Sequence, residues 1–187
     1  MLDTELNPSS DLWLSDVEAP HIITDPNLFK WDDQADLVIA GLGGAGIAAA
    51  NEALDQGLSV IGIDKNTGGG STAKSGGVYY AGGGTPIQKE AGIDDSPENM
   101  FNYLIQETGD IIKESTLKRV CETSAENTQW LMDNGVKFNS SYYKKKSSYP
   151  DAGYFLYHSD NSIVPSYMEN AKPAARGHRG WAVSYTH

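Results

Sequence analysis

The chain has 187 residues, of which 39% are hydrophobic and 21% charged, and its formal net charge is -11. This composition is typical of a globular protein, and without a run of 18 or more apolar residues we expect no integral membrane span. An acidic chain lacks the clustered Lys and Arg that nucleic acid binding needs, so we expect no nucleic acid partner. The single cysteine, Cys121, permits no internal disulfide and no metal cluster. The acidic N-terminus lacks the basic and then apolar order of a signal peptide, and we therefore predict a cytoplasmic protein.

Residues 1–34 carry proline, aspartate and serine without a sustained hydrophobic period, and we interpret them as an extended N-terminal arm. The arm also carries large apolar side chains, which predict that parts of it dock on the body of the protein. These are Trp13, Leu14, Ile22, Ile23, Phe29 and Trp31.

Regular structure begins at Ala35. Residues 35–40 are a short apolar run that ends at glycine, as in a strand buried on both faces. The Ala-rich residues 47–54 predict a helix that stops near Gly57, and residues 59–64 predict a second buried strand. A right-handed crossover of this size is a βαβ unit with parallel strands.

The segment between the first strand and the helix reads GLGGAG. Gly41 allows a tight turn, Gly43 lets the backbone approach a pyrophosphate, and Gly46 lets the helix pack closely on the sheet. Asp64 ends the second strand, where a carboxylate accepts hydrogen bonds from ribose hydroxyls. An acidic side chain at this position argues against NADP, and the fingerprint predicts a dinucleotide site.

A second glycine-rich segment, residues 67–84, contains hydroxyl side chains and the apolar sequence VYY. A simple NAD-binding unit has no need of such a loop directly after its acidic strand. FAD is longer and must be contacted on both sides of its pyrophosphate, and exposed backbone with hydroxyls supplies such contacts. We therefore favour FAD over NAD.

Two helices should follow. The first begins at Ser96-Pro97, an N-cap with proline at the first helical position, and the second runs from about Ser115 to Asp133. Cys121 lies on the apolar face of the second helix, which favours a core position over a reactive thiol. From Lys137 onward the sequence is irregular and rich in tyrosine, and the run Lys144–Lys146 indicates a solvated loop.

The sequences GLGGAG, IDK and GGSTAKSGG resemble the superfamily of FAD-dependent fumarate reductases and 3-ketosteroid dehydrogenases. The sequences AGGGTPIQKEAGIDDSPENMFNYL and KPAARGHR are most similar to its 3-oxosteroid dehydrogenase branch. The resemblance implies an α/β fold, with a Rossmann-like FAD-binding domain built on a parallel sheet and then the start of an α+β substrate-capping domain. Relatives run to several hundred residues, so we predict an arm at 1–34, the first segment of a discontinuous FAD-binding domain at 35–136, and the beginning of the capping domain at 137–187.

The resemblance also implies which residues hold FAD. The residues assigned to the pyrophosphate are Gly41, Gly43, Gly44, Ala45 and Gly46, and those assigned to the adenosine ribose are Asp64 and Lys65. The residues assigned to the flavin side are Gly70, Ser71, Thr72, Ser75, Gly76 and Gly77. Asp64 stands where the family more often has glutamate. Lys74 replaces a side chain that is usually uncharged, and it either favours an anionic reduced flavin or points to solvent.

The implied reaction removes or adds two hydrogens across a carbon–carbon bond next to a carbonyl, on a ketosteroid or, alternatively, on an unsaturated acid. The catalytic residues and the electron acceptor are not identified, although a tyrosine hydroxyl could serve as acid or base. The candidates as a group are Tyr142, Tyr143, Tyr149, Tyr154 and Tyr157. The cations Arg176, His178 and Arg179 could hold a dicarboxylate, but we favour a structural role for them. A third hypothesis is that these 187 residues alone are an inactive FAD-binding fragment.

Overall fold

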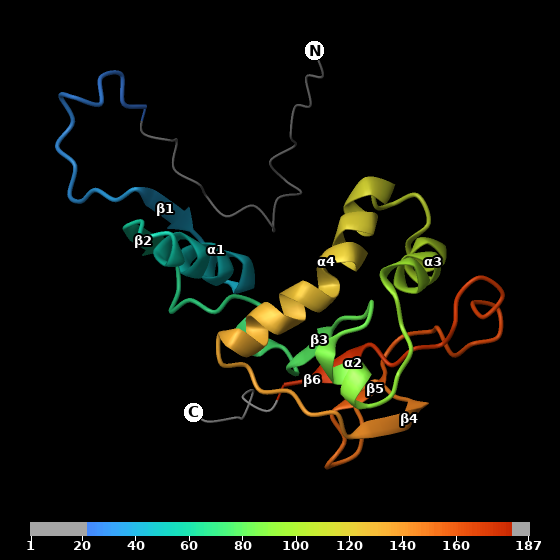
Figure 1. The fold of residues 1–187 in the computed structure, drawn as a ribbon. Coiled ribbons are helices and arrows are strands. Elements are labelled where there is room, and N and C mark those ends of the chain that lie inside the picture. Colours follow the sequence, from blue (N-terminus) through green and yellow to red (C-terminus); the bar gives the residue numbers. More distant parts are fainter. Residues whose placement is uncertain (1–21, 181–187) are drawn as a thin grey trace, which may run out of the picture.

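A computed structural model describes residues 22–180. Its elements fall into two groups, which Figure 1 shows side by side: a βαβ unit, and a four-stranded sheet with three helices. In chain order the elements are β1 (Leu37–Ala40), α1 (Gly44–Asp55), β2 (Val60–Ile63), the 3₁₀ turn η2 (Thr72–Lys74), β3 (Val78–Tyr80), α2 (Pro86–Glu90), α3 (Pro97–Thr108), α4 (Glu114–Asp133), β4 (Tyr142–Lys146), β5 (Leu156–His158) and β6 (Gly177–Arg179).

The βαβ unit confirms the predicted strand, helix and strand. β1 and β2 pair in parallel, from Leu37 opposite Val60 to Ala40 opposite Ile63. α1 begins at Gly44, inside the glycine fingerprint, and not at residue 47 as the sequence pattern indicated. The three glycines of the fingerprint therefore form the turn and the first helical turn together.

The second group is built on the sheet order β3-β6-β5-β4. β6 pairs antiparallel with both β3 and β5, and β4 pairs in parallel with β5. One sheet thus joins β3, at residues 78–80, to strands from residues 142–179, and it extends across the predicted domain boundary at 136/137. That boundary stays a prediction about the whole protein.

Helices α3 and α4 pack on each other, and α2 contacts α4. The core around Ile87 of α2 and Leu156 of β5 includes Ala175, with Met132 and Phe138 against it. The caps explain where two helices begin: the Ser96 hydroxyl accepts a hydrogen bond from the Asn99 amide at the start of α3, and Thr85 and Gln88 form a reciprocal capping box at α2.

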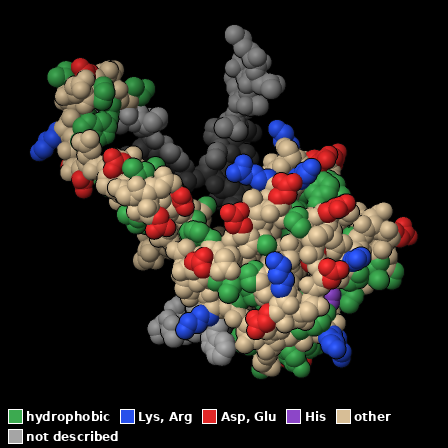
Figure 2. All heavy atoms as spheres, in the orientation of Figure 1, with side chains coloured by type: hydrophobic (Ala, Val, Ile, Leu, Met, Phe, Trp, Pro, Cys, Tyr) green, Lys and Arg blue, Asp and Glu red, His purple; other side chains and the backbone are tan. Residues whose placement is uncertain are grey.

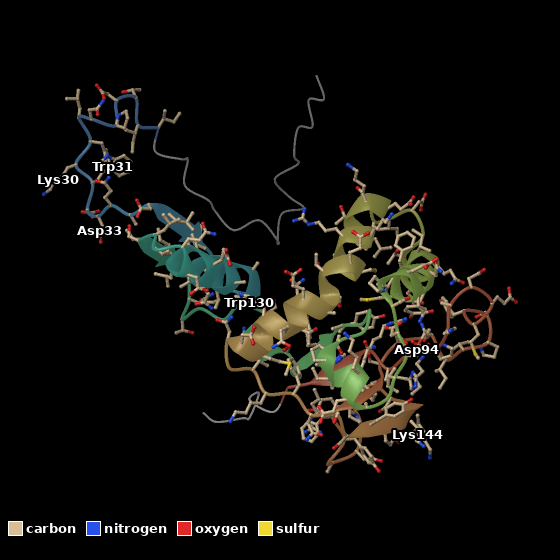
Figure 3. The ribbon with its side chains drawn as sticks, viewed as in Figure 1. Lys30, Trp31, Asp33, Asp94, Trp130 and Lys144 are labelled. Carbon is tan, nitrogen blue, oxygen red and sulfur yellow. The ribbon has the colours of Figure 1, made fainter. Side chains whose placement is uncertain are left out.

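The described part of the N-terminal arm has exposed apolar side chains and a local aromatic contact. Ile22 is 80% exposed, and the rings of Phe29 and Trp31 lie 4.7 Å apart and pack on each other. In Figure 3 Trp31 lies on the arm, away from the four-stranded sheet. Docking of the arm on the body stays a prediction, and Trp13 and Leu14 fall outside the described residues.

Candidate functional site

The first glycine loop makes a tight turn between β1 and α1. The amide of Gly41 donates to the Ile63 carbonyl at 2.7 Å, and its φ of 96° is a conformation that favours glycine. A Cβ on Gly46 would lie 2.0 Å from the Gly41 carbonyl oxygen, so no side chain fits there. The helix can therefore start close behind the strand only because this position is glycine.

This turn leaves the N-terminus of α1 open to a ligand. Gly43 is the N-cap and makes no side-chain capping bond, and the following residues are Gly44, Ala45 and Gly46. The first amides of a helix have no intrahelical partner, and they lie at the positive end of the helix dipole. Small residues and open amides fit a pyrophosphate, and the pyrophosphate site at this turn stays a prediction.

Asp64 follows β2 and accepts a hydrogen bond from the first glycine loop. One carboxylate oxygen accepts from the Leu42 amide and the other from the Asn66 amide, both at 2.8 Å. The hydrogen bonds from the Asn66 and Leu42 amides lower the pKa of Asp64, and the charge of the exposed Lys65 adds a smaller effect. An ionised carboxylate has further lone pairs, so Asp64 can accept ribose hydroxyls while it holds the loop.

The second glycine loop packs directly on the first. The Gly69 amide donates to the Leu42 carbonyl at 2.7 Å, and a Cβ on Gly70 would lie 3.1 Å from the Gly43 Cα. A Cβ on Gly44 would meet the Thr72 hydroxyl at 2.9 Å. The structure therefore brings Gly43 and Gly44 together with Gly70 and Thr72, and the glycines permit this close approach.

The remaining predicted residues of the second loop extend toward the four-stranded sheet. Ser71 precedes η2 without a capping bond, and the Ser75 hydroxyl accepts from the Gly77 amide at 3.3 Å. Gly77 leads into β3, and its carbonyl accepts from the Gly180 amide at 3.2 Å. The 13 residues assigned to FAD thus lie on one continuous path from α1 to β3, while their individual roles toward FAD stay predictions.

A cavity of about 430 Å³ adjoins both glycine loops and the end of α4. Its lining includes Gly43, Gly69 and Thr72 from the loops, and Trp130 and Leu131 from α4. In Figure 3 Trp130 lies where α4 approaches the βαβ unit. Trp130 was not predicted from the sequence, because only the packing of α4 places it beside the loops.

The five candidate tyrosines make different contacts. The Tyr142 hydroxyl is 2.6 Å from His158 Nε2, and the Tyr157 hydroxyl donates to the Ser148 carbonyl at 3.1 Å. The rings of Tyr143 and Tyr154 pack on each other at 5.2 Å. Tyr149 lies against the second glycine loop, since a Cβ on Gly76 would be 3.9 Å from its ring.

Arg176 has a structural role, because its side chain is fully buried and ion-paired. Its Nε and Nη2 donate to the two Asp95 oxygens at 2.9 Å each, and Nη1 lies 3.4 Å from Asp160. Burial acts to raise the pKa of Asp95, but the hydrogen bonds and charge of Arg176 outweigh it and hold that pKa below its usual value. Asp160 also accepts from the Tyr80 hydroxyl at 2.8 Å, so the network connects β3 to the segment before β6.

His178 and Cys121 are also core residues. His178 Nε2 lies 2.9 Å from the Thr85 hydroxyl, and burial lowers the pKa of His178 to about 4. Burial raises the pKa of the Cys121 thiol to about 11, which fits the predicted core position. Within residues 22–180, no cluster of three or more His, Cys, Asp or Glu side chains could hold a metal, and no helix is long and apolar enough to cross a membrane.

Comparison with known proteins agrees with this geometry. The family model described as "FAD binding domain" matches residues 36–182. The chain is 40% identical over 153 residues to the 3-oxo-5-alpha-steroid 4-dehydrogenase of Comamonas testosteroni, which covers 80% of this chain and 29% of that protein. It is 35% identical over 106 residues to the fumarate reductase (cytochrome) of Shewanella frigidimarina, covering 56% of this chain and 18% of the relative.

A solved structure is similar as well. It is the 3-ketosteroid-delta4-(5alpha)-dehydrogenase of Rhodococcus jostii RHA1 in complex with 4-androstene-3,17-dione, at a TM-score of 0.77 and 40% identity, covering 82% of this chain and 32% of that chain. The chain thus spans about a third or less of the length of these proteins. The two glycine loops, the carboxylate of Asp64 after β2 and the matched family model lead to one conclusion: the chain belongs to the FAD binding domain family, and its cofactor is FAD.

Proposed function

We propose that the full-length protein is an FAD-dependent oxidoreductase that acts on a carbon–carbon bond next to a carbonyl, with a 3-oxosteroid as its substrate. The observation that carries this proposal is the 40% identity to a 3-oxo-5-alpha-steroid 4-dehydrogenase over 80% of this chain. The solved relative, with 4-androstene-3,17-dione bound, supports the same substrate class at the same identity.

FAD supplies the hydride chemistry when it is bound, and the protein positions it. The part of the protein described above holds the cofactor. The N-terminus of α1 binds the pyrophosphate, Asp64 accepts the ribose hydroxyls, and the loop from Gly70 to Gly77 contacts the flavin side. We assign no catalytic acid or base within this chain, and the tyrosines remain candidates as a group.

A fumarate reductase-like activity is the second candidate, and the 35% identity to a fumarate reductase favours it. A dicarboxylate substrate needs accessible cations. Arg176 is fully buried and paired with Asp95, and His178 is 1% exposed, so neither is available for that role. The burial of these two of the three candidate cations favours the steroid proposal, whereas Arg179 is half-buried.

The proposed setting is the cytoplasm. A single, buried cysteine supports it. A small-molecule substrate is the proposed partner, and the electron acceptor is not assigned.

Turnover assays with the full-length protein test the proposal. We expect oxidation of a saturated 3-ketosteroid with an artificial electron acceptor, and no reduction of fumarate by a reduced dye. Fumarate reduction without steroid turnover would overturn the steroid proposal and favour the second candidate. For the 187 residues alone we expect no catalysis.

A further inference from the structure

Arg179 is placed differently from its buried neighbour Arg176. In the ladder between β3 and β6 it lies opposite Val78, whereas His178 lies opposite Tyr79. Side chains opposite each other in an antiparallel pair share a face, and successive residues alternate between faces. Arg179 and His178 therefore project from opposite faces of the sheet, and Arg179 is only half-buried.

Two aromatic rings hold the Arg179 guanidinium. Its central carbon lies 4.5 Å from the centroid of the Tyr149 ring and 5.5 Å from that of Phe155. The ion pairs of arginines within residues 22–180 all belong to Arg176. An arginine that stacks on rings without a carboxylate partner keeps its positive charge available to another group.

This cation adjoins the flavin-side loop. Tyr149, on which it stacks, lies 3.9 Å from the position of a Cβ on Gly76, and the Gly180 amide that follows Arg179 donates to the Gly77 carbonyl at 3.2 Å. The strand β6 thus ends at the glycines that we assign to the flavin side. One aromatic ring separates the guanidinium from the loop.

We propose that Arg179, held by Tyr149, provides a positive charge beside the flavin and stabilises the reduced form of the ring. This inference rests on the proposed assignment of Gly76 and Gly77 to the flavin side. The hydride that leaves the substrate brings two electrons and one proton to the oxidised ring, so the ring gains negative charge. A nearby cation favours that state and raises the midpoint potential of the flavin.

The midpoint potential of the full-length holoprotein, measured by equilibration with a reference dye, tests the role of Arg179. Arg179→Gln removes the charge, and we expect the equilibrium constant for two-electron reduction to fall about tenfold, which is about 30 mV. Arg179→Lys keeps a charge at the same place and should restore most of the potential. Tyr149→Phe keeps the ring and should leave the potential unchanged.

If the contact of Arg179 with Tyr149 only stabilises the fold, the result is different. In that case Arg179→Gln would lower the melting temperature but leave the potential of the bound flavin as in the wild type, which would overturn the inference. If Arg179→Gln does not retain flavin, Tyr149→Ala decides, because it frees the guanidinium from the loop; an unchanged potential there would also overturn the inference. A wild-type protein without flavin absorbance would instead refute the FAD assignment itself.

Discussion

At the scale of single residues, two glycines of the fingerprint have separable roles. Gly46 is required by packing, since a Cβ there would overlap the Gly41 carbonyl at 2.0 Å. Gly43 is not, because a Cβ there would meet only the Gly70 Cα at 3.9 Å, and its φ of -81° suits any residue. The structure therefore predicts different consequences of substitution at the two positions.

We predict that Gly46→Ala lowers the melting temperature of the apoprotein and removes bound FAD. Gly43→Ala should leave the free energy of unfolding of the apoprotein within about 0.5 kcal/mol of the wild type. It should nevertheless lose FAD, because its methyl group would lie where we propose that the pyrophosphate binds. Thermal melts and the flavin absorbance of the purified proteins check both. Full flavin content in Gly43→Ala would argue against a pyrophosphate at this turn.

Removing the charge of Arg176 from its buried pair with Asp95 should lower the free energy of unfolding more than removing an exposed charge. Arg176→Leu leaves Asp95 buried without its partner, and we expect the free energy of unfolding to fall by about 3–5 kcal/mol. The matched control is Lys172→Leu, which breaks the exposed pair with Asp94 at 3.7 Å and should cost at most about 1 kcal/mol. Urea denaturation measures both, and equal losses would contradict the structural role of Arg176.

His178 predicts how stability depends on pH. Burial lowers the pKa of His178 to about 4, whereas an unfolded histidine titrates near 6.5. Between these values the unfolded chain binds a proton that the folded protein does not. The free energy of unfolding therefore falls as the pH drops from about 6.5 to about 4, by about 3 kcal/mol from this group.

Urea midpoints at a series of pH values check this dependence. Burial also lowers the pKa of His158, which titrates in the same direction, so His178→Phe should flatten the pH dependence only in part. The variant keeps an aromatic ring beside Phe138 and Tyr79 while it removes the titrating group. An unchanged slope in His178→Phe would show that His178 does not titrate as proposed.

At the scale of elements, the sequence predicted what local patterns determine. The apolar runs and glycine punctuation located β1 and β2, and the second long helix was placed at 115–133 against the observed Glu114–Asp133. β3 and β6 have three residues each and were missed, because so short a segment shows no period. α2 was also missed, although Thr85 and Gln88 have the spacing of a capping box.

The candidate site was likewise predicted only where its pattern is local. Its glycines and Asp64 were predicted from a motif whose spacing is local. The contact of Gly70 with Gly43 and the position of Trp130 depend on how distant segments pack, as does the bond from Arg176 to Asp95, 81 positions apart in the chain. No local pattern records such contacts.

The cap of α3 is an element whose contribution can be measured. The Ser96 hydroxyl accepts from the Asn99 amide at 3.1 Å, and Pro97 follows at the first helical position. Ser96→Ala should lower the free energy of unfolding by about 1 kcal/mol. Ser115→Ala, on the exposed surface of α4, is the matched control, and chemical denaturation should show little change for it. An equal effect in both variants would mean that the cap adds nothing specific.

At the scale of the whole molecule, the two groups of elements meet where FAD is proposed to bind. Figure 2 shows apolar side chains on the surface of the βαβ unit, and Val38, Leu54 and Ile63 are each more than half exposed. The βαβ unit contributes the first glycine loop and Asp64, whereas the second loop continues into β3 of the larger sheet. A ligand that contacts both loops therefore connects the two groups.

This arrangement predicts that FAD stabilises the protein more than its ADP half does. A ligand that binds only the folded state adds stability that grows with the ratio of its concentration to its dissociation constant. In the proposed assignment ADP occupies the N-terminus of α1 and Asp64, and only FAD reaches the loop toward Gly77. Melting temperatures of the full-length apoprotein, measured with each ligand at equal concentration, should rise with both and rise further with FAD.

Gly70→Ala separates the two contributions. Its φ of 53° and the Gly43 Cα at 3.1 Å make the substitution strained, so it should displace the second loop from the first. The extra stabilisation by FAD over ADP should then shrink, while the shift that ADP produces should persist if the first loop keeps its shape. Equal shifts with ADP and FAD in the wild-type protein would mean that the second glycine loop does not bind the flavin half.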